Sequence, residues 1–150
     1  MTYSFDDRNI NWRKFDFLGS AYFVYAANET EGVVDVLIRF PPNARGTLHR
    51  HTMDYITIVL QGELRFYRPD GGLKEIRPTG SYTRVAANGE PHREGAGEQE
   101  AIVLFSIRGG TGPMFTIWEE DGTERILGFT DFRAALDAQI ESGDYVKIQG

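Results

Sequence analysis

Short apolar segments with a period of two restrict the fold of this chain more than any other feature. From residue 20 to about residue 118, apolar residues alternate with polar ones or form short solid runs bounded by Gly, Pro, Asn or Asp. Because successive side chains of a strand point to opposite faces, this pattern is typical of an all-β barrel or sandwich. Strands are expected at 21–26, 33–40, 47–51, 55–60, 63–67, 74–76, 81–85, 101–108 and 114–118.

Turns and one helix complete the expected elements. The segments Asp70-Gly71-Gly72 and Gln61-Gly62 resemble hairpin turns, since Gly readily takes the positive φ that tight connections need. Near the C-terminus, apolar residues at helical spacing predict a helix over 131–141, with Thr130 or Asp131 as its cap and Gly143 after its end. We expect this helix to cover an open end or edge of the barrel. Since no repeat and no interior linker interrupts the sequence, one domain over 1–150 is predicted, with its barrel core at about 20–118.

Composition excludes several classes of function. The 150 residues include 16 basic and 22 acidic side chains, a net charge of −6, whereas nucleic-acid binding depends on clustered Lys and Arg. No cysteine is present, so disulfides, thiolate metal sites and cysteine nucleophiles are excluded, and any metal must be held by His, Asp, Glu or backbone oxygen. No segment is apolar for long enough to span a bilayer, and the N-terminus lacks the pattern of a signal peptide. We therefore expect a cytoplasmic protein with neither nucleic acid nor membrane as a partner.

The three histidines are the candidate ligands of a metal site. His49 and His51 are two positions apart on an expected strand, so both imidazoles lie on one face and can converge on one ion. If His92 comes from a neighbouring strand of the same inner face, the three form a facial set with coordination positions left open for chemistry. The alternative is a coincidence, in which His49 is solvated, His51 is a hydrogen-bonded core residue and His92 belongs to a turn.

The motifs around these histidines resemble those of a small single-domain cupin, which implies an antiparallel jelly-roll barrel. The first cupin motif has His-x-His, then three or four residues, Glu, six residues and Gly; here His49-Arg50-His51 is followed by Tyr55 in the Glu position and then by Gly62. The second motif begins with Gly and ends in His, as in the segment from Gly80 to His92. Tyr55 in place of Glu is a departure, because many cupins hold their metal with three histidines and one Glu.

A site with three histidines and no carboxylate resembles that of the Fe(II) dioxygenases that cleave acetylacetone and dihydroxyacetophenone. The segment FSIRGGTGPMFTIWEEDGTE also resembles their last-strand region. The resemblance implies that His49, His51 and His92 are iron ligands, and that O2 and a small enolisable β-diketone or hydroxyaryl ketone are the substrates. The substrate would chelate the ion as its enolate, because an ion that keeps its full +2 charge favours an anionic ligand. O2 would then attack the enolate, and the C–C bond would break.

Strand parity suggests further residues of the site. If His49 and His51 face inward, Tyr55 and Thr57 follow them, while Tyr82 and Arg84 would line the cavity from the strand before His92. Tyr55 is a candidate hydrogen-bond donor to a ligand imidazole or a substrate oxygen, and Arg84 a candidate partner of an anionic substrate. Asp54 is an alternative carboxylate ligand if a bulge turns it inward.

Two other classes of function use the same barrel. One is a redox-neutral hydrolase, isomerase or lyase with Zn, Ni or Mn, since imidazole ligation does not by itself select iron. The other is a ligand-binding or sensory protein without catalysis. Cupins commonly associate through sheet edges, so a homodimer or homotetramer is expected.

Overall fold

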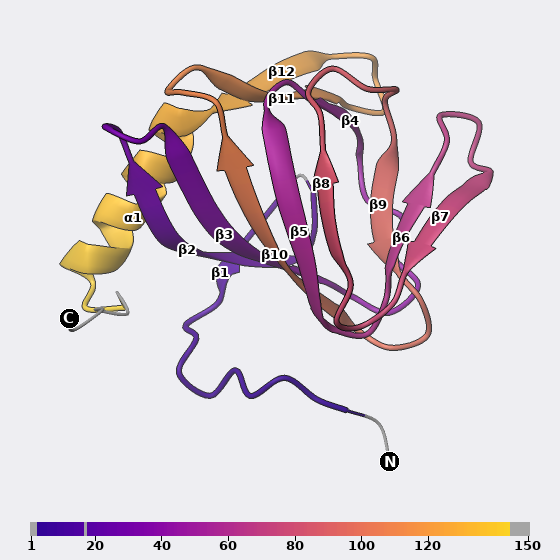
Figure 1. The fold of residues 1–150 in the computed structure, drawn as a ribbon, viewed down its shortest axis with the longest axis horizontal. Helices are drawn as coiled ribbons and strands as arrows, with labels where there is room; N and C mark the ends of the chain where they lie inside the picture. The colour runs from indigo at the N-terminus through magenta and orange to yellow at the C-terminus, as the bar shows by residue number, and fades with distance from the viewer. Residues whose placement is uncertain (1–2, 17, 145–150) are drawn as a thin grey trace.

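The computed structural model describes residues 3–16 and 18–144, and its elements are twelve strands followed by one helix (Figure 1). They are β1 Arg13–Lys14, β2 Ala21–Asn28, β3 Val33–Phe40, β4 Leu48–His51, β5 Asp54–Gln61, β6 Leu64–Tyr67, β7 Leu73–Arg77, β8 Tyr82–Val85, β9 Arg93–Ala96, β10 Ala101–Arg108, β11 Pro113–Trp118, β12 Glu124–Gly128 and α1 Phe129–Glu141. Within these described residues no helix is long and apolar enough to cross a membrane.

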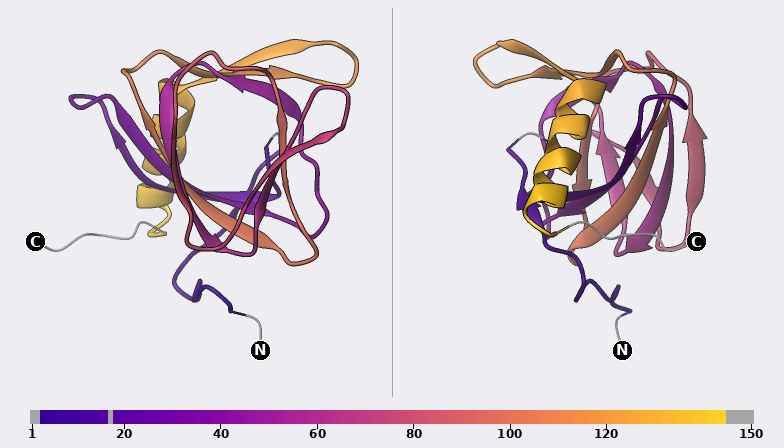
Figure 2. Two further views of the ribbon diagram at one scale, coloured as in Figure 1. Left: turned by 45° about the vertical axis from the view of Figure 1, so that its right-hand side comes forward. Right: turned by 90° about the vertical axis from the view of Figure 1, so that its left-hand side faces the viewer.

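The strands form an antiparallel barrel (Figures 1 and 2). One wall is a six-stranded sheet in the order β1-β2-β3-β10-β5-β8, and the opposite wall consists of two three-stranded sheets, β12-β11-β4 and β7-β6-β9. An isolated antiparallel bridge between His49 and His92 connects these two smaller sheets across β4 and β9. The predicted all-β jelly roll with a short C-terminal helix is therefore confirmed.

All nine predicted strands are present with ends that differ by two residues or fewer, while β1, β9 and β12 were not predicted. The Asp70-Gly71-Gly72 turn joins the paired strands β6 and β7, with Gly71 at a φ of 93°. The prediction of a hairpin at Gln61-Gly62 is wrong, because β5 pairs with β10 and β8 rather than with β6. Gly62, at a φ of 67°, instead turns the chain from one wall of the barrel to the other.

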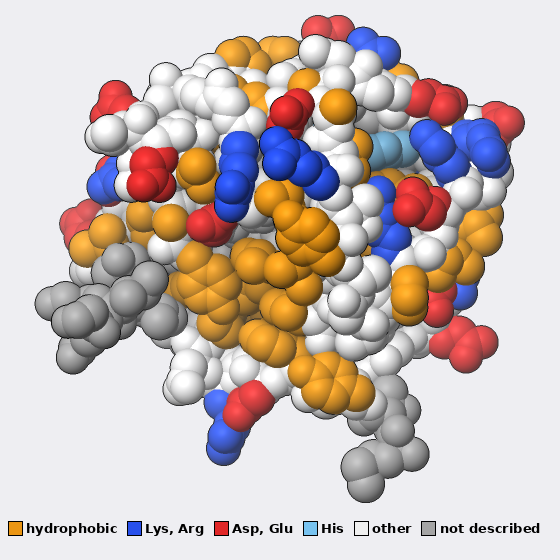
Figure 3. Space-filling view, viewed as in Figure 1, with side chains coloured by type: hydrophobic (Ala, Val, Ile, Leu, Met, Phe, Trp, Pro, Cys, Tyr) orange, Lys and Arg blue, Asp and Glu red, His pale blue; other side chains and the backbone are white. Residues whose placement is uncertain are grey.

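The barrel core is apolar, and its side chains come from the inward positions of both walls. It includes Phe40, Val59, Phe105, Phe115 and Ile117, each at most 1% exposed. A second, smaller cluster of Phe23, Leu37 and Ile102 lies on the outer face of the six-stranded sheet, packed against residues such as Trp12 from the N-terminal segment. Figure 3 shows hydrophobic side chains gathered on this face of the molecule.

Helix α1 lies outside the barrel beside β2 (Figure 2). It begins at Phe129, two residues earlier than predicted, and its N-cap is Gly128 rather than Thr130 or Asp131. Asp131 accepts a hydrogen bond from the Gly128 N–H at 2.8 Å, so it stabilises the first turn from inside the helix. The buried Gln139 side chain accepts from the Val24 N–H and donates to the Val24 carbonyl, which joins the helix to β2 beyond the short pairing of that strand with β1.

Candidate metal centre

The backbone brings the three histidines together at the junction of the two small sheets. His49 and His51 lie on the same face of β4, and β11 pairs with one edge of that strand. Across the opposite edge, the N–H of His49 donates to the His92 carbonyl and the N–H of His92 donates to the His49 carbonyl, both at 2.9 Å. This reciprocal pair of bonds places His92 directly beside His49, as the expected barrel topology requires.

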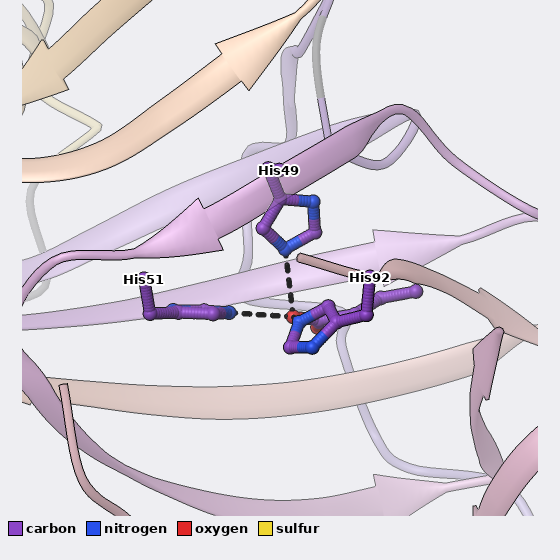
Figure 4. Close-up of side chains that lie close together, drawn as sticks. His49, His51 and His92 are labelled. Atoms are coloured by element: carbon purple, nitrogen blue, oxygen red, sulfur yellow. Dashed lines mark hydrogen bonds and ion pairs between the residues drawn. The ribbon is translucent and has the colours of Figure 1, made fainter. Parts of the chain in front are cut away.

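The three imidazoles converge on one carboxylate oxygen that sequence analysis did not predict. Glu94 lies on β9, two residues after His92, and its Oε1 is 2.9, 2.7 and 2.8 Å from Nε2 of His49, His51 and His92. Figure 4 shows the imidazoles directed at this common point. Within the described part of the chain, these four residues are the one group whose donors could hold a metal ion, and their ligand atoms all lie within 4.8 Å of one another.

The cluster is buried, and burial determines its charge state. Burial lowers the pKa of His51 to about 3, although Glu94 opposes the shift, so this imidazole is neutral. For Glu94, burial by itself favours the neutral acid, but the three neighbouring imidazoles outweigh it and hold the pKa well below its usual range. The centre is therefore an ionised carboxylate surrounded by nitrogen donors.

The tautomer of His49 makes this arrangement fit a cation. Nδ1 of His49 lies 2.8 Å from the Thr47 carbonyl, which can only accept, so Nδ1 carries the proton. In a neutral His49, Nε2 then presents a lone pair to the Glu94 carboxylate, which is also an acceptor, at 2.9 Å. Two facing acceptors at this distance repel unless a proton or a metal cation lies between them. Three imidazoles and one carboxylate are donors that Fe, Mn, Ni and Zn accept, so the residues fit a divalent ion.

Aromatic side chains fix the orientation of the ligand imidazoles. Tyr55 stacks on His51 with ring centroids 3.7 Å apart and an interplanar angle of 17°. Phe115 packs against His51, and Phe66 makes a T-shaped contact with His92. The Tyr55 hydroxyl is buried and has no hydrogen-bond partner among the described residues. Burial raises the pKa of Tyr55, so the hydroxyl keeps its proton and remains a donor.

A pocket of about 140 Å³ extends from the cluster towards the surface. Its inner lining includes His51, His92 and Tyr55, and its mouth includes Lys74, Glu75 and Glu90. Figure 3 shows a histidine side chain in a hollow between charged side chains. His92 is the most exposed of the three histidines, at 9%. The cluster is therefore connected to a space that a small molecule can occupy.

Parity predicted the inner face of β5 correctly and that of β8 wrongly. Tyr55 and Thr57 are buried inside the barrel, as expected. Arg84 does not line the pocket: β8 pairs with β5 so that Val85 lies opposite Tyr55, which puts Arg84 on the outer face, exposed. Tyr82 shares that face and is 62% exposed. The prediction that Tyr82 and Arg84 line the cavity is therefore wrong.

The carboxylate of the cluster and the arginine of the pocket are both other residues than those predicted. Asp54 is exposed and accepts a hydrogen bond from the Ala87 N–H at 2.9 Å, so it does not supply the carboxylate of the cluster. The arginine that does line the pocket is Arg77, at the end of β7, which is 6% exposed. Its Nη1 donates to Oγ1 of Thr57 at 2.9 Å.

Comparison with known proteins identifies the fold. The sequence matches no protein-family model and no curated protein. Among solved structures, an RmlC-like cupin protein from Ralstonia eutropha JMP134 has a TM-score of 0.68 at 14% identity, over 100% of this chain and 93% of its own. An acetylacetone dioxygenase from Acinetobacter johnsonii has a TM-score of 0.65 at 15% identity, over 92% of each chain.

The chain therefore has a cupin fold. Structural similarity also extends to the DMSP lyase DddQ from Ruegeria pomeroyi DSS-3, with a TM-score of 0.51 at 18% identity over 67% of this chain and 56% of the lyase. Proteins with different activities thus share the barrel, and the choice among activities depends on the site.

Proposed function

We propose that this protein is a metal-dependent dioxygenase that cleaves a C–C bond of a small enolisable β-diketone or hydroxyaryl ketone. His49, His51 and His92 are the proposed ligands of Fe(II), and Glu94 is a fourth donor. The observation that carries the proposal is the convergence of three Nε2 atoms on one carboxylate oxygen within 2.9 Å, beside a pocket. When bound there, iron would supply a Lewis acid that favours the enolate and the redox chemistry for O2.

The protein's own residues contribute positioning and exclusion of water. The stacked Tyr55 and the packed Phe115 hold His51 in one orientation, which keeps its Nε2 directed at the centre. Tyr55 is a pocket-lining residue, but its hydroxyl is buried, so the proposed hydrogen bond from this unpartnered hydroxyl to an oxygen of the bound enolate requires the side chain to turn towards the pocket when substrate binds. The small volume of the pocket favours a small substrate and leaves little room for bulk water.

A redox-neutral reaction at the same site is the second candidate, and the carboxylate of Glu94 favours it. A donor set that includes a carboxylate suits Zn, Ni and Mn as well as Fe. A lyase among the structural neighbours is consistent with such chemistry on this fold. A purely ligand-binding role has less support, because Asp54 does not block the centre and side chains do not fill the pocket.

The test is to load metal-free protein with Fe(II) under argon, add 2,4-pentanedione, admit air and record O2 uptake together with the cleavage products. Uptake that matches product formation, and that is lost in His49→Ala, supports the dioxygenase. Arg84→Gln is the matched control, because Arg84 lies on the outer face and this variant should retain activity. Turnover of substrate by the zinc-loaded protein without O2 would favour the redox-neutral alternative, and full activity in His49→Ala would contradict both.

A further inference from the structure

Arg77 is a buried charge in the pocket that the proposed metal chemistry does not use. Its side chain is 7% exposed, and three strands hold it in place. Nη1 donates to Thr57 of β5, while Nε and Nη2 donate to the carboxylate of Glu75 at 3.0 and 3.4 Å. The guanidinium also lies 4.1 Å from the centre of the Phe66 ring, and Phe66 contacts His92. Arg77 is thus fixed beside the candidate metal centre.

The guanidinium retains hydrogen-bonding capacity in this position. Arginine has five N–H groups, and the bonds to Thr57 and Glu75 use three of them. One N–H on each terminal nitrogen has no acceptor among the described residues. Because Arg77 lines the same pocket as His51 and His92, a ligand in that pocket is within reach of these donors. A planar guanidinium with two available N–H groups is suited to a carboxylate or an enolate oxygen.

The charges of the pocket lining are paired, so charge alone does not select the ligand. At its mouth, Lys74 and Glu90 form an ion pair at 3.6 Å, and Arg77 is paired with Glu75, so these four charges cancel. The two N–H groups that Arg77 has left are donors that only an acceptor can satisfy, and a carboxylate can accept from both at once.

We propose that Arg77 is a specificity-determining residue that binds a carboxylate of the substrate, so that the preferred substrate is a small dicarbonyl acid rather than a neutral diketone. This inference rests on the proposed metal site. The metal centre receives the dicarbonyl end of the molecule, and Arg77 receives the carboxylate.

The experiment compares two compounds of equal heavy-atom count, 2,4-dioxopentanoate and 5-methylhexane-2,4-dione, in which an isopropyl group replaces the carboxylate. Calorimetric titration of zinc-loaded protein avoids oxidation and measures binding alone. We expect the acid to bind about 10- to 100-fold more tightly, the range for a charge-assisted contact. Arg77→Gln should remove most of this preference and leave the affinity for the diketone within a few-fold, while Arg77→Lys should restore part of it.

Zinc content and thermal stability of each variant show whether it is folded, and Arg84→Gln is the control for loss of an arginine outside the pocket. Equal affinity of the wild type for the two compounds would overturn the inference, even if Arg77→Gln fails to fold. A parallel loss of both affinities in a folded Arg77→Gln would also overturn it, since that result indicates a structural role. A zinc-loaded protein that prefers the acid, but whose iron form never takes up O2, would contradict the proposed dioxygenase and leave this inference standing.

Discussion

Replacing Tyr55 by Phe should stabilise the protein. The Tyr55 hydroxyl is buried without a partner, and such a group costs about 1–3 kcal/mol of folding free energy. The ring makes the packing contacts, stacking on His51 at 3.7 Å and lying 6.2 Å from Phe105, and a Phe ring retains both. Tyr55→Phe is therefore expected to raise the free energy of unfolding by about 1–3 kcal/mol. In a domain of this size, each kcal/mol raises Tm by about 2–4 °C.

The measurement is urea unfolding followed by tryptophan fluorescence, with a chelator present so that metal binding does not contribute. Tyr67→Phe is the matched control, since Tyr67 is another buried barrel tyrosine, but its hydroxyl is not among the buried polar atoms that lack a partner. Removal of that hydroxyl should therefore leave Tyr67→Phe no more stable than the wild type. A rise in the urea midpoint that is specific to Tyr55→Phe would identify its hydroxyl as an unsatisfied group.

The same variant should lose catalytic rate if the hydroxyl bonds the substrate. A gain in stability together with a loss of turnover is the expected signature of a polar group retained for function at the expense of stability. If Tyr55→Phe is instead less stable than the wild type, the hydroxyl has a partner in solution, and both the assignment of an unpartnered donor and its proposed contact with the substrate are refuted.

Three further predictions concern the centre and its supporting strand. Zinc at a hundredfold excess over its Kd should stabilise the protein by about 2.7 kcal/mol in thermal unfolding, and His51→Ala should abolish this shift. Glu94→Gln should weaken zinc binding by more than the ~10–100-fold that is typical for loss of a residue that only hydrogen-bonds a ligand. Chelator competition measures the zinc affinity, and an unchanged affinity would exclude Glu94 as a donor. Gly95→Ala should destabilise the fold by about 3 kcal/mol or more in urea, because the new Cβ would lie 1.7 Å from the Ala44 carbonyl oxygen. Gly89→Ala, with no atom within 4 Å of its Cβ, should change stability by less than about 0.5 kcal/mol.

Strand parity predicts side-chain direction only where the apolar pattern fixes the phase. On β4 and β5 the buried residues alternate with more exposed ones, so His49, His51 and Tyr55 were placed correctly. Strand β8 reads Tyr-Thr-Arg-Val, and either alternating pair could face a polar pocket. The register with β5, rather than the sequence of β8, selects Val85 for the inside. A short strand without an apolar face therefore needs its neighbour before its side chains can be placed.

Strand β9 and Glu94 escaped prediction for a related reason. The segment Arg-Glu-Gly-Ala has no alternation of apolar residues, since one of its buried positions is a carboxylate and another is a glycine. Gly95 is required there because the Ala44 backbone passes too close for any side chain. One signal was available: His92-Arg93-Glu94 repeats the i, i+2 spacing of His49-Arg50-His51, so a strand through His92 puts Glu94 on the ligand face.

The position of Glu94 changes the electrostatic argument for the site. With Tyr55 at the usual position of the first-motif carboxylate, the sequence predicted an ion that keeps its full +2 charge and so favours an enolate. Glu94 brings a carboxylate to the histidines from β9, two residues after the second motif, which reduces the net charge of a loaded centre to +1. Arg77 lines the same pocket, but its charge is paired with Glu75, so it contributes hydrogen-bond donors rather than net charge. One pocket then holds a centre that can bind a dicarbonyl and a guanidinium whose remaining N–H groups can bind an acid, and this combination is the physical basis for expecting a substrate with both groups.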